Sequence, residues 1–80
     1  MQKYIKTYLD FFDYGIDDFI KCEVCAAKSS DIHHIIYKSQ GGSNDIENLI
    51  ALCRDCHNAA HDCKITKDYL LDIHKKFMGV

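Results

Sequence analysis

Residues 53–61 read CRDCHNAAH, and this stretch decides the fold because it joins a cysteine pair directly to a histidine pair. Upstream, residues 22–25 read CEVC, so the chain carries two Cys-x2-Cys knuckles. Two residues between thiolates let both sulfurs reach one ion, and two such pairs complete a closed tetrahedral zinc site. The alternatives are two unrelated cysteine pairs or a thioredoxin-type redox motif, which would need a βαβ context. We therefore expect a structural zinc on Cys22, Cys25, Cys53 and Cys56.

The size and composition of the chain fit that expectation. Its 80 residues bury only a small core, so a metal would supply missing stability. A hydrophobic content of 48% argues against disorder. No apolar run is long enough for a membrane span, and the N-terminus lacks the apolar segment of a signal peptide. We expect a single cytoplasmic domain over residues 1–80. Five cysteines in a reducing compartment favour metal over disulfides, and Cys63 is expected to be a small, partly buried residue.

The hydrophobic pattern predicts a small α+β chain. Gly15 is placed to end the first helix, and Thr66 is placed to cap the last one. The aromatic stripe of the first helix is expected to pack into the core, and His74, in the last helix, is expected at the surface. In order, we expect a helix over about 2–14, a strand over 32–37, a polar loop with a Gly41-Gly42 turn, an antiparallel strand over 49–52, a helix over 54–63 and a helix over about 66–77.

Four of the five histidines lie in or beside the segment between the knuckles. Residues 31–34 read DIHH, and His57 and His61 are one helical turn apart. That spacing puts both imidazoles on one face of a helix, where they can bind one metal. A single histidine is more often a solvated or core residue, so the prediction of a site depends on the joint pattern.

This combination resembles the HNH endonucleases of the ββα-metal (His-Me) fold. The resemblance covers residues 22–61 and is carried by the first knuckle, DIHHI, Gly-Gly, Asn48-Leu49, LCRDCH and His61. It implies a two-stranded antiparallel ribbon packed on a helix and one catalytic divalent cation, here with flanking helices and a four-cysteine zinc site. The nuclease domains of bacterial colicins show a similar order of histidines and asparagine, without that zinc site.

The resemblance implies a role for each residue. His34 matches the general base, and Asn48 matches the asparagine that ties the loop to the strand and orients that base. His57 matches a catalytic metal ligand. Asp31 would be an outer partner of a histidine or an added ligand. The residues matched to the catalytic cation are His33, His57 and His61.

The implied reaction is hydrolysis of DNA phosphodiester bonds, by nicking or double-strand cleavage. A neutral histidine, with an ordinary pKa of about 6.5, can accept a proton from water. The cation, Mg²⁺, Mn²⁺, Ni²⁺ or Zn²⁺, would stabilise the phosphoryl and leaving oxygens, and an all-histidine set suits Mg²⁺ least. One geometric difficulty arises, because neighbouring residues of a strand point to opposite faces. His33 and His34 therefore need a bulge, a strand end or a phosphate at the edge of the ribbon.

The net charge of −2 gives no general attraction to DNA. Acidic residues gather in the first quarter of the chain: Asp10, Asp13, Asp17, Asp18 and Glu23. Basic residues flank the motif: Lys28, Lys38, Arg54, Lys64 and Lys67. We therefore expect one mildly positive face and weak, salt-sensitive DNA binding, helped by a homodimer or by a partner protein of a nuclease assembly.

Two other functions remain open at this point. A non-catalytic zinc module that binds nucleic acid or protein explains the cysteines but leaves the DIHH segment and the helical histidine pair without a purpose. A nuclease that acts on RNA is the other alternative. The resemblance also implies a setting: a small stand-alone HNH protein would fit a phage or a mobile element, in the cytoplasm of a bacterial cell or a phage-infected host.

Overall fold

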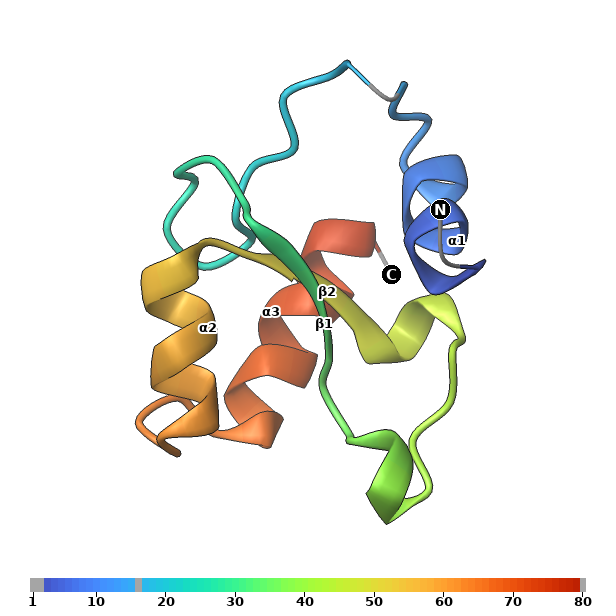
Figure 1. The fold of residues 1–80 in the computed structure, drawn as a ribbon. Coiled ribbons are helices and arrows are strands. Elements are labelled where there is room, and N and C mark those ends of the chain that lie inside the picture. The colour runs from blue at the N-terminus through green and yellow to red at the C-terminus, as the bar shows by residue number, and fades with distance from the viewer. Residues whose placement is uncertain (1–2, 16, 80) are drawn as a thin grey trace.

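The computed structural model describes residues 3–15 and 17–79. Figure 1 shows α1 and α2 on opposite sides of a central hairpin, β1 and β2, with α3 behind the strands. The order strand, strand, helix at the centre is the small α+β arrangement that the sequence predicts. The elements are α1 (Lys3–Phe11), β1 (Asp31–His34), the short 3-10 helices η1 (Lys38–Gln40) and η2 (Ile46–Asn48), β2 (Leu49–Leu52), α2 (Arg54–His61) and α3 (Lys67–Met78).

The two strands form an antiparallel pair in which His33 lies opposite Ile50. All four residues of β2 are buried, as the run LIAL requires, because core packs against both faces of the strand. Ile50 and Leu52 pack with Cys22, Ile35, Ala60 and Leu70, whereas Leu49 and Ala51 pack with Tyr8. The hairpin therefore divides a small core into two clusters, one beside the cysteines and one beside α1.

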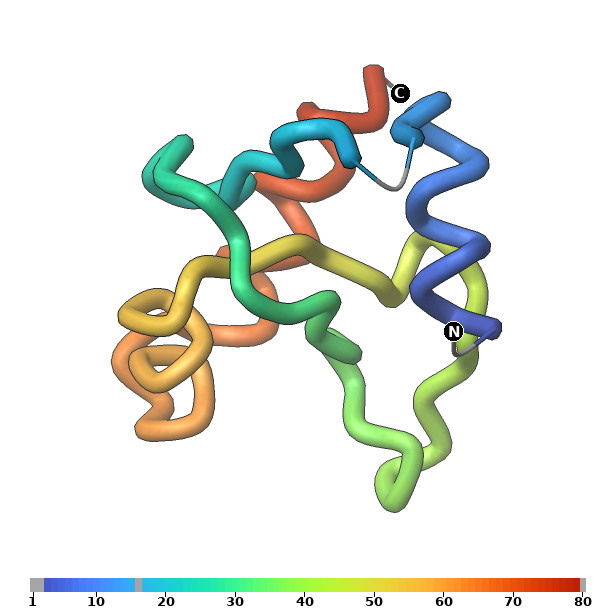
Figure 2. The backbone as a smooth tube through the Cα atoms, turned by 45° about the horizontal axis from the view of Figure 1, so that its top comes forward, coloured from blue at the N-terminus to red at the C-terminus, as the bar shows by residue number. Residues whose placement is uncertain are grey.

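Strand β1 is shorter than the predicted strand over 32–37 and ends at His34. The buried side chain of Asn48 explains this, because its Oδ1 accepts the Ile36 N–H at 2.7 Å and its Nδ2 donates to the Ile36 carbonyl at 2.9 Å. Both main-chain groups of Ile36 are thus taken by a side chain. From this point residues 35–48 leave the hairpin as a projecting loop, visible in Figure 2.

Helices α1 and α2 end earlier than the sequence predicts, and each is followed by a residue with a left-handed backbone conformation. α1 ends at Phe11, and Asp13, at φ 57°, turns the chain before Gly15 is reached. Residue 2, where the predicted helix would begin, lies outside the described residues. α2 ends at His61 because Cys63 has φ 61°. Cys63 is exposed rather than partly buried.

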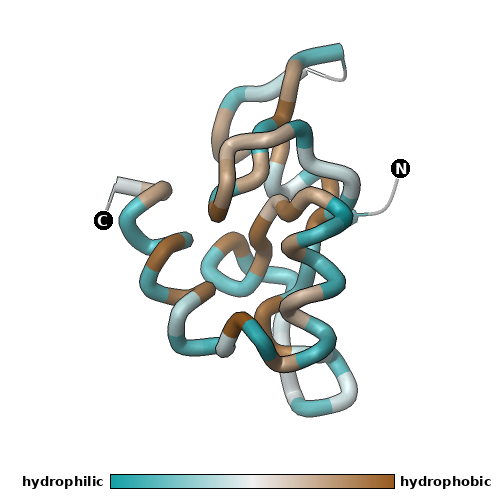
Figure 3. Tube along the Cα trace, turned by 90° about the vertical axis from the view of Figure 1, so that its left-hand side faces the viewer, coloured by the Kyte–Doolittle hydropathy of each residue, from teal (hydrophilic) through white to brown (hydrophobic). Residues whose placement is uncertain are grey.

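Helix α3 begins as the sequence predicts. The Oγ1 of Thr66 accepts the backbone N–H of Tyr69 at 3.1 Å, which is an N-cap. Gly79 ends the helix in a left-handed conformation, at φ 82°. Figure 3 shows hydrophobic and hydrophilic residues alternating along this helix. None of the described helices is long and apolar enough to cross a membrane.

A buried polar group joins four parts of the chain, and it corrects the expectation that His74 lies at the surface. The His74 side chain is 1% exposed, and its Nδ1 lies 2.8 Å from Glu23 Oε1. Its Nε2 donates to the Ile46 carbonyl at 2.6 Å, and the Tyr8 hydroxyl donates to Glu23 at 2.5 Å. Both His74 nitrogens lie at hydrogen-bond distance from oxygen atoms, so the ring is held from two sides. Glu23 is therefore no part of an acidic surface.

Candidate metal centres and active site

The two knuckles bring their four cysteines together. In the first, the Cys22 N–H donates to the Ala27 carbonyl at 2.6 Å and its carbonyl accepts the Ala26 N–H at 2.9 Å, so the chain turns tightly around the sulfurs. The second opens α2, where the Cys53 sulfur accepts the Cys56 N–H at 3.5 Å. The sulfurs of Cys22, Cys25, Cys53 and Cys56 all lie within 4.8 Å of one another.

The chemistry of this cluster suits zinc. Burial raises the pKa of the Cys22 thiol, but hydrogen bonds from backbone groups of Cys53, Cys25 and Val24 outweigh it and lower the pKa to about 7. A thiolate is the form that binds metal, so the fold favours proton release at Cys22, whereas burial and the neighbouring sulfurs raise the pKa of Cys56. Four clustered sulfurs with such amide donors fit the structural zinc site that the sequence predicts.

A second cluster holds three imidazoles. His33 comes from β1, and His57 and His61 come from successive turns of α2. One ring nitrogen from each of the three lies within 4.8 Å of the other two. The Nε2 atoms of His57 and His61 are 3.0 Å apart, so they face a common point, as ligands of one cation do.

The outer nitrogens of the helical histidines face oxygen atoms. Asp31 Oδ2 lies 3.2 Å from Nδ1 of His57, although that nitrogen is buried and makes no well-aligned hydrogen bond. The Tyr37 hydroxyl lies 3.1 Å from Nδ1 of His61. Metal-binding histidines usually direct their second nitrogen to an oxygen acceptor in this way. Asp31 therefore lies behind His57, on the side away from the common point.

The charge state of these imidazoles also suits a metal. Burial, with smaller contributions from the charges of His57 and His61, lowers the pKa of His33 to about 4. Burial also lowers the pKa of His57. Both rings are therefore neutral near pH 7, which is the form that donates a lone pair to a cation. The donor set fits a divalent transition metal such as Zn²⁺, Ni²⁺ or Mn²⁺.

His34 is the last residue of β1, and its position answers the geometric difficulty raised by two adjacent histidines. Because the regular strand stops there, His34 and His33 border the same cavity of about 370 Å³. Nε2 of His34 donates to Asn44 Oδ1 at 2.8 Å, which leaves Nδ1 with its lone pair. The Tyr4 ring packs against the His34 ring, with the ring centroids 4.6 Å apart. The other residues that line this cavity are Asp31, Ile32, Tyr37, Lys38, His57 and His61.

The Asn48 side chain ties the loop to the end of the strand, as the resemblance implies, and its orienting effect on His34 stays a prediction. Besides its two hydrogen bonds to Ile36, its Nδ2 donates to the Ser43 carbonyl at 2.8 Å. Sequence reasoning missed the side chains that touch the histidines, Asn44 and Tyr37. The sequence offers no signal for either one beyond their place in a polar loop, because no fixed spacing links them to the histidines.

The charged residues around the cavity are distributed unevenly. Lys38 borders the cavity, and Lys67 lies with its ammonium 5.0 Å from the centre of the Tyr37 ring. Arg54 is partly neutralised by Asp31, at 3.7 Å. Lys38 therefore faces the predicted site, whereas Lys67 lines a neighbouring cavity that shares His33, Tyr37 and His61 with it.

Comparison with known proteins identifies the family to which this chain belongs. The family model described as HNH endonuclease matches residues 22–63, more than half of the chain. The protein named anaredoxin, from Nostoc sp., is 39% identical over 57 residues, which make up 69% of this chain and 70% of that protein. The type IV methyl-directed restriction enzyme EcoKMcrA, from Escherichia coli K12, is 38% identical over 40 residues, 50% of this chain but only 14% of the enzyme. No solved structure gives a significant match. With the two knuckles and the histidines inside the matched segment, this chain belongs to the HNH endonuclease family.

Proposed function

We propose that this protein is a metal-dependent endonuclease that hydrolyses phosphodiester bonds of DNA. His34 is the general base, and one divalent cation binds to His33, His57 and His61. One observation carries the proposal: the predicted base and three metal-competent imidazoles border a single cavity of about 370 Å³. A purely structural zinc module does not explain why the three-histidine cluster borders the same cavity as the unbonded Nδ1 of His34.

The side chains divide the reaction between them. Nδ1 of His34 accepts the proton of the attacking water, because Nε2 already donates to Asn44. Lys38 lies at the cavity, where its ammonium can contact a phosphate oxygen. When bound, the cation supplies charge stabilisation for the phosphoryl oxygens and the departing 3′ oxygen. The low pKa of His33 keeps its lone pair available to that cation at neutral pH.

DNA is the proposed substrate because the matched relative EcoKMcrA is a restriction enzyme by name. The net charge of −2 limits the electrostatic attraction of the chain alone. We therefore propose that a second copy or a partner protein contributes to DNA binding. The expected signature is cleavage that weakens steeply between low and physiological salt.

Plasmid nicking tests the proposal. Zinc-loaded protein is incubated with supercoiled plasmid and Mn²⁺, Mg²⁺, Ni²⁺ or Zn²⁺, and the variant His34→Ala is compared with wild type. We expect His34→Ala to lose about a hundredfold or more in rate, the usual contribution of a positioned general base. Asn58→Ala is the matched control, since Asn58 is an exposed residue of the same helix as the metal ligands.

Metal content separates the nuclease from the non-catalytic zinc module. The proposal expects about two ions per chain in wild type and about one in the double variant His57→Ala/His61→Ala. One ion per chain in wild type, without cleavage under any metal, would favour the module. Cleavage by His34→Ala at the wild-type rate would show that His34 is not the general base. Faster cleavage of an RNA of the same sequence would show that RNA, rather than DNA, is the preferred substrate.

A further inference from the structure

We propose that Tyr37 is a positioning residue for the histidine metal centre. Its hydroxyl oxygen accepts the Nδ1–H of His61 and so directs the Nε2 of that ring to the cation. The inference rests on the metal site of the proposed function and adds to it, because Tyr37 belongs neither to the cysteine knuckles nor to the histidines of the motif.

His61 needs an outside restraint. It is the last residue of α2, and it is exposed, so its ring has more rotational freedom than the buried His33. Ordering a free side chain costs conformational entropy, and that cost would be subtracted from metal affinity. The Tyr37 hydroxyl lies 3.1 Å from His61 Nδ1, and the two rings stack at 27° with centroids 5.7 Å apart. This contact orders the imidazole before a metal arrives.

The contact also sets the correct tautomer. Nε2 of His61 faces Nε2 of His57 at 3.0 Å, so Nε2 is the nitrogen that points to the metal position. A neutral imidazole that binds a metal through Nε2 must carry its proton on Nδ1. The phenolic oxygen of Tyr37 accepts that proton in a hydrogen bond, which holds the tautomer and increases the basicity of Nε2.

Tyr37 is itself held by the loop. Its carbonyl accepts the N–H of Gln40 at 2.8 Å and the N–H of Gly42 at 2.9 Å. The backbone of Gly42 passes so close that an added Cβ would lie 1.8 Å from the Ile36 carbonyl oxygen. Only glycine allows this close approach, which together with the two hydrogen bonds fixes the backbone on which the Tyr37 side chain stands.

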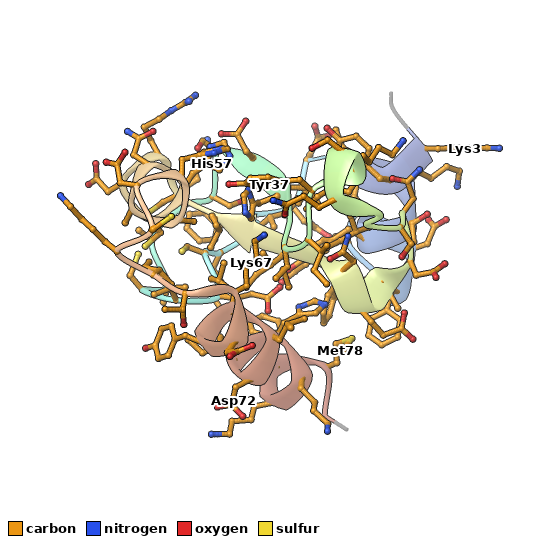
Figure 4. The ribbon with its side chains drawn as sticks, turned by 90° about the horizontal axis from the view of Figure 1, so that it is seen from below. Lys3, Tyr37, His57, Lys67, Asp72 and Met78 are labelled. Carbon is orange, nitrogen blue, oxygen red and sulfur yellow. The ribbon has the colours of Figure 1, made fainter. Side chains whose placement is uncertain are left out.

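The ring is also contacted from the last helix. The ammonium of Lys67, the first residue of α3, lies 5.0 Å from the centre of the Tyr37 ring and donates to Gln40 Oε1. On another side, the His33 ring meets Tyr37 edge to face, with centroids 5.8 Å apart. Figure 4 shows Tyr37 near Lys67, with His57 close by. Tyr37 therefore connects the loop, the last helix and two of the metal-binding imidazoles.

Metal affinity tests the proposal without reference to cleavage. Zn²⁺ is titrated by calorimetry into full-length protein that already carries one zinc per chain, so that the second binding event reports the histidine centre. We expect Tyr37→Phe, which removes only the hydroxyl, to weaken this binding by about 10- to 100-fold. Tyr69→Phe is the matched control, because Tyr69 is 52% exposed on α3, and it should leave the affinity unchanged.

A double-mutant cycle shows whether Tyr37 acts through His61. His61→Ala should weaken Zn²⁺ binding, and in that background Tyr37→Phe should change the affinity by less than twofold. If His61→Ala weakens binding but Tyr37→Phe does not, or if Tyr37→Phe has the same effect in both backgrounds, the positioning role is wrong and the metal site remains. If neither variant weakens binding, both the positioning role and the metal site of the proposed function are wrong.

Discussion

The substitution His74→Ala probes the buried group that connects the helices to the first zinc knuckle. In the folded chain His74 contacts the Glu23 carboxylate and the Ile46 carbonyl, and the Glu23 side chain is 0% exposed. Alanine removes the imidazole and leaves the carboxylate buried, with the Tyr8 hydroxyl as its remaining close donor at 2.5 Å. Removing one partner of a buried hydrogen-bonded pair costs more than the contact contributes, because the other polar group stays in a dry site without its partner.

The magnitude follows from these contacts. Loss of one partner of a buried pair costs about 3–5 kcal/mol. A chain of 80 residues has a free energy of unfolding of roughly 4–12 kcal/mol. For a domain of this size each kcal/mol corresponds to about 4–8 °C in Tm, so the variant should melt at least about 12 °C below wild type. Lys75→Ala, at the exposed neighbouring residue, should stay within about 0.5 kcal/mol of wild type.

The assay is thermal and urea unfolding followed by circular dichroism at one fixed free zinc concentration, since zinc binding contributes to the measured stability. A second variant, Glu23→Ala, removes the carboxylate that His74→Ala would leave unpaired. In the His74→Ala background this second substitution should cost far less than it does alone. If His74→Ala melts within 3 °C of wild type, or if the two effects simply add, the buried pair does not stabilise the fold as argued.

Four other outcomes are expected. Removal of zinc by a strong chelator should abolish the far-UV circular dichroism signal of the helices, and an unchanged spectrum would contradict a stapling role for the cysteines. Burial lowers the pKa of His33 to about 4 in the folded chain, so as the pH falls the unfolded chain, with its ordinary histidine pKa of about 6.5, takes up the proton before the folded chain does. The stability that neutral His33 contributes should therefore be complete above about pH 6.5 and be lost as the pH falls towards 4. NMR titration of the His33 ring and unfolding measurements at each pH would check this. Gly42→Ala should destabilise the loop and reduce cleavage, because the new Cβ would meet the Ile36 carbonyl oxygen at 1.8 Å. Gly41→Asn, at φ 86° with open space around it, should have a smaller effect in both assays, because its cost is backbone strain alone and Asn adopts the left-handed conformation more readily than most residues. Asn44→Ala removes the acceptor of the proton on the predicted base and should lower kcat about tenfold with KM unchanged, and a wild-type rate would show that this hydrogen bond is not needed.

The parts of the fold that follow local rules were predictable. A hydrophobic run of four residues predicted β2 over residues 49–52, and Thr66 predicted the start of α3. The end of β1 was not predictable, because the side chain of Asn48 takes the backbone groups that the strand ladder would otherwise use. The ends of α1 and α2 were set by left-handed residues, Asp13 and Cys63; Asp adopts that conformation more readily than most residues, but Cys has no such preference.

The same division applies to the site. The two-residue spacing of each cysteine knuckle and the helical spacing of His57 and His61 translate directly into geometry, because a knuckle and a helix have fixed dimensions. Their assignment as ligands stays a prediction until metal is measured. His74 was misjudged because an isolated histidine near the end of a chain gives no indication of Glu23, which lies 51 residues away in sequence.

The sequence by itself determined the two clusters of predicted metal ligands, the α+β order of elements and the family, because each depends on short spacings that the backbone converts into fixed positions. Only the tertiary structure decided how those residues are held. Tyr37 reaches His61 across 24 residues, and Asn44 reaches His34 across 10, through a loop whose path depends on Asn48 and on the close approach at Gly42. Such contacts depend on the packing of one particular loop against the hairpin and α3, and no periodicity in the chain encodes that packing.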